Sequence, residues 1–237
     1  MADVEVPTGQ AKRSYVQGMF RDIAPRYDLL NHLLSLNLDR RWRRRAVRQL
    51  GWETCPDGTY LDACAGTLDL AAELAHRPGF GGTVIGADFV VPMLRRGKGK
   101  APVPAVGADT LTLPFADGTF DGATVGFGVR NLADLDAGFR ELRRVLKPGA
   151  RLVILEFATP RVWPVRQLYL FYFRRVLPTI GRTVSKHTDA YSYLPASVLR
   201  FPEPEELAER MKAAGFPTVE YQRLTLGIVA VHCGIAQ

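Results

Sequence analysis

Short apolar runs alternate along the middle of the chain with longer segments whose apolar residues recur at helical spacing. The runs predict strands near residues 59–64, 83–89, 104–109, 122–128 and 151–157. Helical spacing marks the stretches between them, at 68–77, 90–97 and 134–146. The runs are apolar on both faces and rich in Val and Ile, as in strands covered by helices on both sides. This alternation predicts a parallel, doubly wound α/β sheet.

The two ends of the chain follow other patterns. Residues 10–50 have helical periodicity that Pro25 interrupts, and two more helices are expected at about 163–178 and 204–214. Residues 218–236 then divide into two strands separated by a short turn. We therefore expect a mostly parallel, seven-stranded sheet that ends in an antiparallel hairpin. A helical lid, residues 1–50, would precede a domain of residues 51–237, both in one compact unit.

Composition narrows the location of the protein more than its function. The chain has 237 residues, is 47% hydrophobic and carries a formal charge of +7. Its three cysteines form no CxxC pair, so we expect neither a disulfide framework nor a metal site. The N-terminus lacks the order of a signal peptide, and no apolar stretch reaches the ~18 residues that span a bilayer. These features predict a cytoplasmic protein, at most peripheral at the inner face of a membrane.

Acidic residues follow three successive predicted strands: Asp62, Asp88 and Asp109, the last beside Thr110. Ligands of open α/β sheets bind outside the carboxyl ends of the strands, although a single acid there is often only a helix cap. An acid after the second strand suits ribose hydroxyls, and one after the third can meet the adenine amino group. Asp62 would repel a pyrophosphate but suits the cationic groups of S-adenosylmethionine. The set therefore favours S-adenosylmethionine over NAD as the cofactor.

The segment LDACAGTLDL, residues 61–70, has a single glycine in the predicted turn. A cofactor without a pyrophosphate needs less room than a dinucleotide, and Gly66 can supply the backbone geometry. Thr67, at the start of the next helix, can donate to a carboxylate. Leu68 occupies the place where a further glycine is common, and we expect it to pack inward.

Several segments together carry a resemblance that covers residue 12 to the C-terminus. They are YDLLNHLLSLNLDRRW (27–42), LDACAGTLDL, LPFADGTFD (113–121), GFGVRN (126–131), RVLKPGARLVILEF (144–157), DAYSYL (189–194) and GIVAVHCG (227–234). In these the chain resembles the class I, Rossmann-like S-adenosylmethionine-dependent methyltransferases that C-methylate demethylmenaquinone and ubiquinone precursors. The resemblance implies methylation of a lipophilic polyprenyl quinol, demethylmenaquinol to menaquinol. It also implies a cofactor contact at Gly126, where the family often has serine.

The resemblance assigns three residues to the substrate side: Tyr27, Arg130 and Asn131. Arg130 would stabilise a developing oxyanion, because a guanidinium stays protonated and is a poor base. Asn131 would orient the ring oxygen, and Tyr27 would close the lid. Structural alternatives remain: Arg130 and Asn131 could cap the next helix and pair with Asp134, and Tyr27 could be a core aromatic. The remaining candidates are interpreted as structural or exposed: His32, His187, His232 and Cys64.

A basic cluster, Arg40, Arg41, Arg43, Arg44, Arg45 and Arg48, surrounds Trp42 on one predicted helix. It is either a solvated face or a reversible contact with anionic lipid headgroups, with Trp42 at the interface. Nucleic acid is not expected, because aromatic residues are not interleaved with the cluster. A homodimer is possible. The alternative functions are a methyltransferase for a soluble phenol or nucleic acid, and a catalytically silent subunit with the same fold.

Overall fold

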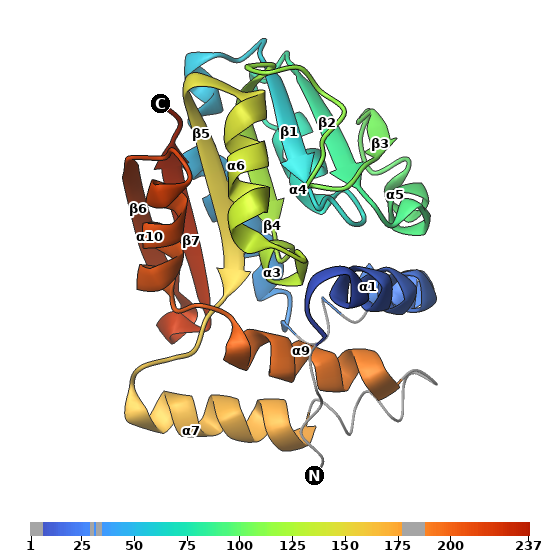
Figure 1. Ribbon diagram of the computed structural model, residues 1–237, viewed down its shortest axis with the longest axis vertical. Coiled ribbons are helices and arrows are strands. Elements are labelled where there is room, and N and C mark those ends of the chain that lie inside the picture. The colour runs from blue at the N-terminus through green and yellow to red at the C-terminus, as the bar shows by residue number, and fades with distance from the viewer. Residues whose placement is uncertain (1–6, 29–30, 32–34, 177–187) are drawn as a thin grey trace.

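A seven-stranded sheet forms the centre of the computed structural model, which describes residues 7–28, 31, 35–176 and 188–237 (Figure 1). The strand order is β3-β2-β1-β4-β5-β7-β6; β1 to β5 pair in parallel, and β7 pairs antiparallel with both β5 and β6. The predicted sheet with its closing hairpin is therefore confirmed. The strands are β1 Thr59–Ala63, β2 Thr83–Asp88, β3 Ala105–Gly107, β4 Phe120–Gly126, β5 Leu146–Phe157, β6 Thr218–Leu224 and β7 Val229–Ile235.

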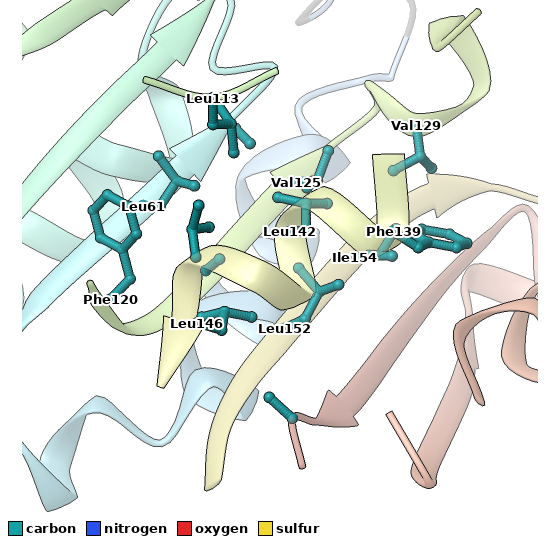
Figure 2. Packing of buried hydrophobic residues seen from close by; sticks show 14 of the residues in the cluster. Leu61, Leu113, Phe120, Val125, Val129, Phe139, Leu142, Leu146, Leu152 and Ile154 are labelled. Atoms are coloured by element: carbon teal, nitrogen blue, oxygen red, sulfur yellow. The ribbon is translucent and has the colours of Figure 1, made fainter. Parts of the chain in front are cut away.

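Helices cover both faces of the sheet. The helices α3 Leu38–Leu50, α4 Asp69–Ala75 and α5 Val91–Gly97 lie on one face, and α6 Leu135–Val145 and α10 Pro204–Ala213 lie on the other. Residues of β5 point alternately into the two cores, Leu152 and Ile154 toward α6 and Val153 and Leu155 toward α3. Figure 2 shows Phe139 and Leu142 of α6 packed on Ile154 and Val125. Burial on both faces explains why the strands are continuous apolar runs.

Three more helices lie at the carboxyl ends of the parallel strands, where α1 and α9 pack against each other and α7 lies below them in Figure 1. They are α1 Gly9–Ile23, α7 Trp163–Phe171 and α9 Thr188–Arg200. The predicted break at Pro25 is confirmed, because α1 ends at Ile23 and a 3-10 turn, Ala24–Arg26, follows. A π-helical turn, Tyr172–Val176, continues α7. The helix α1 therefore lies beside the carboxyl ends of the strands (Figure 1).

Two elements differ from the sequence-based expectation. The helix α9 was not predicted there, because Pro195 within it argues against a continuous helix. The strand β5 begins at Leu146, earlier than expected, because Leu146 pairs with Phe120 while Lys147 to Ala150 form an irregularity before Arg151 pairs with Gly122. Neither difference alters the order of the sheet.

Within the described part of the chain, none of the helices has the length and apolar character that a membrane span requires.

Candidate active site

The order of the strands reverses between β1 and β4, and this is where open α/β sheets bind ligands. Asp62 of β1 stands in register with Thr124 of β4, whose hydroxyl donates to the carboxylate at 2.9 Å. The amide of Ala71 in α4 donates to the other carboxylate oxygen at 3.0 Å. Asp62 is only 1% exposed. The register of two neighbouring strands therefore fixes a buried carboxylate at the switch point.

The turn after β1 adopts left-handed backbone at Cys64, Gly66 and Leu68, with φ values of 50°, 52° and 64°. This conformation favours glycine, so Leu68 is unusual there. Its side chain is buried, as expected, against Gly86 and Gly97. A Cβ on these glycines would lie 2.3 Å from Leu68 Cδ2 and 2.9 Å from Leu68 Cγ, respectively. The absence of side chains on these two neighbours makes room for leucine at a position where glycine is common.

The acids after β2 and β3 lie along the same edge. Asp88 accepts hydrogen bonds from the backbone N–H of Gly66 at 2.8 Å and of Val90 at 2.7 Å. Asp109 accepts from Leu111 N–H at 3.0 Å and pairs with Arg13 of α1 at 2.6 Å. These contacts join the loops after three neighbouring strands into one carboxylate-lined edge, with α1 across it.

Burial makes two of these carboxyl groups weaker acids than usual. It raises the pKa of Asp62 to about 7 and that of Asp88 to about 6, against the hydrogen bonds that each accepts. Two poorly solvated carboxyl groups at one edge of the sheet match a cationic ligand, whose charge would favour their ionised forms.

The raised pKa of Asp62 predicts a pH effect on folding. Its folded-state pKa lies above the unfolded value, so the folded protein holds the extra proton between pH 4 and 7. The free energy of unfolding should therefore fall as pH rises through that window, by at most about 1.4 kcal/mol per pH unit. In Asp62→Asn the amide can accept from Ala71 and donate to Thr124, so this part of the slope should vanish. Urea unfolding at pH 4.5, 6 and 7.5 measures the difference, and equal slopes in both proteins would contradict it.

A small cavity of about 30 Å³ lies at the switch point, with room for about one water molecule. Its lining includes Tyr27, Asp62, Gly66, Thr67 and Gly126. A Cβ on Gly126 would lie 2.5 Å from Leu70 Cδ1, so even a small side chain would require Leu70 to shift. Five residues predicted for the cofactor or the lid are therefore gathered around one space. Thr110 lies just behind it, its hydroxyl 3.3 Å from Cys64 Sγ.

The N-terminal segment closes over this cavity through polar contacts. The Thr67 hydroxyl donates to Asp28 at 2.6 Å, and Lys100 bridges Asp28 and Asp69. Gln17 of α1 donates to the carbonyl of Phe89 at 3.2 Å. Tyr27 is half-buried, its ring in edge contact with Phe20, and burial raises the pKa of its hydroxyl. Tyr27 thus combines the packing of a core aromatic with a place on the cavity wall.

Arg130 and Asn131 lie beyond β4 in a 3-10 turn, Val129–Asn131, and both are buried. Arg130 Nη1 donates to the carbonyl of Phe127 at 2.6 Å and pairs with Glu156 of β5 at 2.7 Å. Asn131 accepts from the hydroxyl of Tyr193 in α9 at 3.1 Å. The alternative pairing with Asp134 is wrong, because Arg130 pairs with Glu156 instead; Asp134 caps α6 by accepting from Ala137 N–H.

Glu156 is a site residue that the sequence analysis missed. It is 1% exposed, and its carboxylate also accepts from its neighbour's backbone, Phe157 N–H, at 2.9 Å. It stands at the carboxyl end of β5, as Asp62 and Asp88 do at the ends of β1 and β2. The rule that selected those acids would have found it.

A second cavity, of about 460 Å³, opens beside Arg130 between the 3-10 turn, α6, α9 and α10. Lys12 of α1 lines it and donates to the carbonyl of Leu132 at 2.7 Å. Burial, with a smaller contribution from the charge of Arg130, lowers the pKa of Lys12. Of the three substrate-side residues, Arg130 therefore borders this larger space, whereas Tyr27 lines the small cavity at Asp62.

The basic cluster on α3 requires a correction. Trp42 is 5% exposed, donates to Thr225 and packs on Phe127 and Phe157, so it cannot reach a membrane interface. Arg43 is also buried and pairs with Asp39 and Asp69 on the cavity wall. Both face inward because α3 packs on the sheet. The exposed members of the cluster are Arg40, Arg41, Arg44, Arg45 and Arg48.

Histidine takes no part in the described site. His232 is buried in β7, with Nε2 at 2.9 Å from the carbonyl of Pro204, and burial lowers its pKa to about 4. Its predicted structural role agrees with this geometry. His32 and His187 lie outside the described residues.

Comparison with known proteins covers nearly the whole chain. The ubiE/COQ5 methyltransferase family matches residues 8–236. A demethylmenaquinone methyltransferase from Thermus thermophilus is 50% identical over 221 residues, which are 91% of this chain and 99% of that protein. A ubiquinone/menaquinone biosynthesis C-methyltransferase UbiE from Geotalea daltonii is 44% identical over 94% of this chain and 97% of its own length.

Solved structures agree on the fold. A SAM-dependent methyltransferase from Thermotoga maritima superposes with a TM-score of 0.64 over 93% of this chain and 99% of its own, at 18% identity. The superposition confirms the predicted fold class. The family match and the relatives confirm the enzyme class, and S-adenosylmethionine is the cofactor. Because the family matches residues 8–236 and a relative is 50% identical, the chain belongs to the ubiE/COQ5 methyltransferase family.

Proposed function

We propose that the protein methylates a ring carbon of demethylmenaquinol, a lipophilic quinol, to give menaquinol. The observation that carries this proposal is the 50% identity, over 99% of its length, to a relative named demethylmenaquinone methyltransferase. The donor is S-adenosylmethionine, which supplies an electrophilic methyl group on a sulfonium when bound. The residues of this chain bind the two reactants, align them and exclude water.

The carboxylate edge fits the cofactor by its chemistry. Asp62 would meet the cationic amino-acid end, Asp88 the ribose hydroxyls, and Asp109 with Thr110 the adenine. Gly66 and Thr67 would hold the methionine carboxylate, and Gly126 would leave room on the β4 side. The raised pKa of Asp62 supports its assignment to the cationic end, because an anion that burial destabilises gains most from a bound cation.

Arg130 and Asn131 would act on the quinol. Deprotonation of a ring hydroxyl increases electron density on the neighbouring carbon, and a fixed cation stabilises the resulting oxyanion. Arg130 can do this from a buried position that Glu156 and the Phe127 carbonyl hold in place. Asn131, held by Tyr193, would orient the same oxygen.

The lid consists of the segment from α1 to Tyr27, with Asp28 beside it. It covers the edge through Arg13, Gln17 and Asp28. A cavity of about 30 Å³ is far below the roughly 300 Å³ or more of small-molecule sites, so the segment must open for the cofactor to enter. The helix α3 packs in the main core and does not belong to the lid.

Product analysis tests the proposed activity. We expect the purified protein to transfer labelled methyl from S-adenosylmethionine to a short-chain demethylmenaquinol in detergent, with menaquinol identified by mass spectrometry. A soluble phenol such as catechol and a transfer RNA serve as competing substrates. Methylation of either in preference to the quinol would contradict the proposal, and S-adenosylhomocysteine binding without methylation would favour a silent subunit.

We also propose reversible contact with an anionic membrane. The helix α7 exposes large apolar side chains, Trp163 at 73%, Leu168 at 70% and Phe171 at 59%. Exposed aromatic and aliphatic side chains on one helix suit shallow insertion at a lipid surface. Exposed arginines of α3 would add salt-dependent attraction.

Sedimentation with vesicles separates the two contributions. We expect binding to vesicles with anionic lipid at low salt that weakens severalfold as salt approaches 0.5 M. The variant in which Arg40, Arg41 and Arg48 are all changed to Glu should lose the salt-dependent part of vesicle binding. The variant in which Trp163, Leu168 and Phe171 are all changed to Ser should lose vesicle binding at both low and high salt. Equal binding of all three proteins, or binding to neutral vesicles alone, would contradict the proposal.

A further inference from the structure

Among the described residues, four buried side-chain nitrogen or oxygen atoms lack a hydrogen-bond partner, and two of them lie at the substrate side of the site. These two are Arg130 Nε and the hydroxyl of Tyr169. The others, Arg77 Nε and His232 Nδ1, belong to α4's C-terminal turn and to β7. Buried polar groups are nearly always paired, so each exception calls for an explanation.

Tyr169 points inward from α7, the helix whose neighbouring residues Leu168 and Phe171 are exposed. It is 5% exposed and belongs to a cluster with Phe173 and Val198, against which Phe157 packs. The guanidinium of Arg130 lies over the ring of Phe157, with Cζ 5.4 Å from its centroid. Phe157 therefore has Arg130 over its ring and also packs on the cluster that holds Tyr169.

Charged groups of the site also affect the pKa of the Tyr169 hydroxyl. Burial raises its pKa, the charge of Arg130 opposes the shift, and that of Glu156 adds to it. The hydroxyl therefore stays protonated at neutral pH and is a hydrogen-bond donor, as is the Nε–H of Arg130. Two buried donors without partners among the described residues, linked through Phe157, call for an acceptor, and an oxygen with negative charge is the strongest.

Building on the proposed function, we propose that Tyr169 contacts the substrate: its hydroxyl and Arg130 Nε both donate hydrogen bonds to one ring oxygen of the quinol. The helix α7 would then present apolar side chains outward to the lipid and one hydroxyl inward to the quinol ring. The role is that of an oxyanion donor, and no bond to Tyr169 forms or breaks.

The variant Tyr169→Phe removes the hydroxyl alone. We expect kcat/KM for short-chain demethylmenaquinol to fall 10- to 100-fold, while calorimetric binding of S-adenosylhomocysteine changes less than twofold. Thermal stability should stay equal or rise, because the hydroxyl has no hydrogen-bond partner among the residues that the structure describes. The control is Tyr172→Phe, which removes a half-buried hydroxyl from the adjoining turn, where Arg130 and Glu156 do not affect the pKa. It should leave kcat/KM within twofold of the starting protein.

A binding experiment keeps the inference testable without turnover. With S-adenosylhomocysteine present, tryptophan quenching would compare 1-naphthol, which has the ring oxygen, with naphthalene, which lacks it. We expect 1-naphthol to bind at least fivefold more weakly to Tyr169→Phe and naphthalene to bind equally to both proteins. Unchanged 1-naphthol binding, or a parallel loss for both ligands, would overturn the role of Tyr169. Failure of the unaltered protein to methylate the quinol, with the 1-naphthol difference intact, would instead count against the proposed reaction.

Discussion

Asp88→Asn is expected to weaken S-adenosylhomocysteine binding at least tenfold. The carboxylate would accept the ribose hydroxyls, and hydrogen bonds to charged groups contribute roughly 1.5–3 kcal/mol. An amide keeps one acceptor but directs its NH₂ at a second donor, since Gly66 and Val90 both donate to Asp88. Loss of the charge itself should not destabilise the fold at pH 7, because burial already raises the pKa of Asp88 to about 6. Titration calorimetry measures the affinity.

A matched carboxylate lies at the opposite edge of the sheet. Asp121, at the start of β4, accepts from the backbone N–H of Thr59 at 2.9 Å and pairs with Lys147 at 2.6 Å. Asp121→Asn should lower thermal stability, because it weakens the pair with Lys147, and should leave cofactor affinity unchanged. The assignment of Asp88 to the ribose would be wrong if Asp88→Asn bound S-adenosylhomocysteine as tightly as the unaltered protein. It would also be wrong if Asp88→Asn and Asp121→Asn lost affinity equally.

The carboxylate edge could be predicted because it depends on local signals. Each acid follows an apolar run, and parallel strands bring their carboxyl ends to one edge whatever the details of packing. The inward position of Leu68 was also predictable, since a large apolar side chain in a turn of small residues is stabilised by burial. What the sequence did not reveal is how Gly86 and Gly97, distant along the chain, make room for it.

The features of the site that the sequence did not predict depend on contacts between elements that are distant along the chain. Nothing near Arg130 in the sequence indicates that its partner is Glu156, because the pairing arises from the adjacency of β4 and β5. The basic run on α3 appears uniform in the sequence, yet the packing of one helical face places Trp42 and Arg43 inside. The helix α9, which supplies Tyr193, is hidden by Pro195. Charge patterns show which residues are basic but not which of them reach solvent.

Arg130→Lys is expected to lower turnover roughly 10²- to 10³-fold, the usual effect of removing one oxyanion donor. Lysine keeps the charge opposite Glu156 but has no planar fork, so it cannot hold Glu156 and the Phe127 carbonyl and still present an Nε–H. Because these contacts lie beyond the carboxylate edge, the affinity for S-adenosylhomocysteine should change less than twofold. Single-turnover methylation of demethylmenaquinol measures the chemical step directly.

Arg144→Lys is the matched control for this prediction. Arg144 also pairs with a glutamate, Glu141 at 2.7 Å, and donates to backbone carbonyls, but it lies on α6 and holds the loop of Leu113 and Phe115. Its replacement should lower thermal stability and leave turnover nearly intact. If Arg130→Lys retained normal turnover, or lost it only in step with cofactor affinity and stability, as a purely structural ion pair would, then Arg130 would serve to join β4 to β5 and the oxyanion would require another donor.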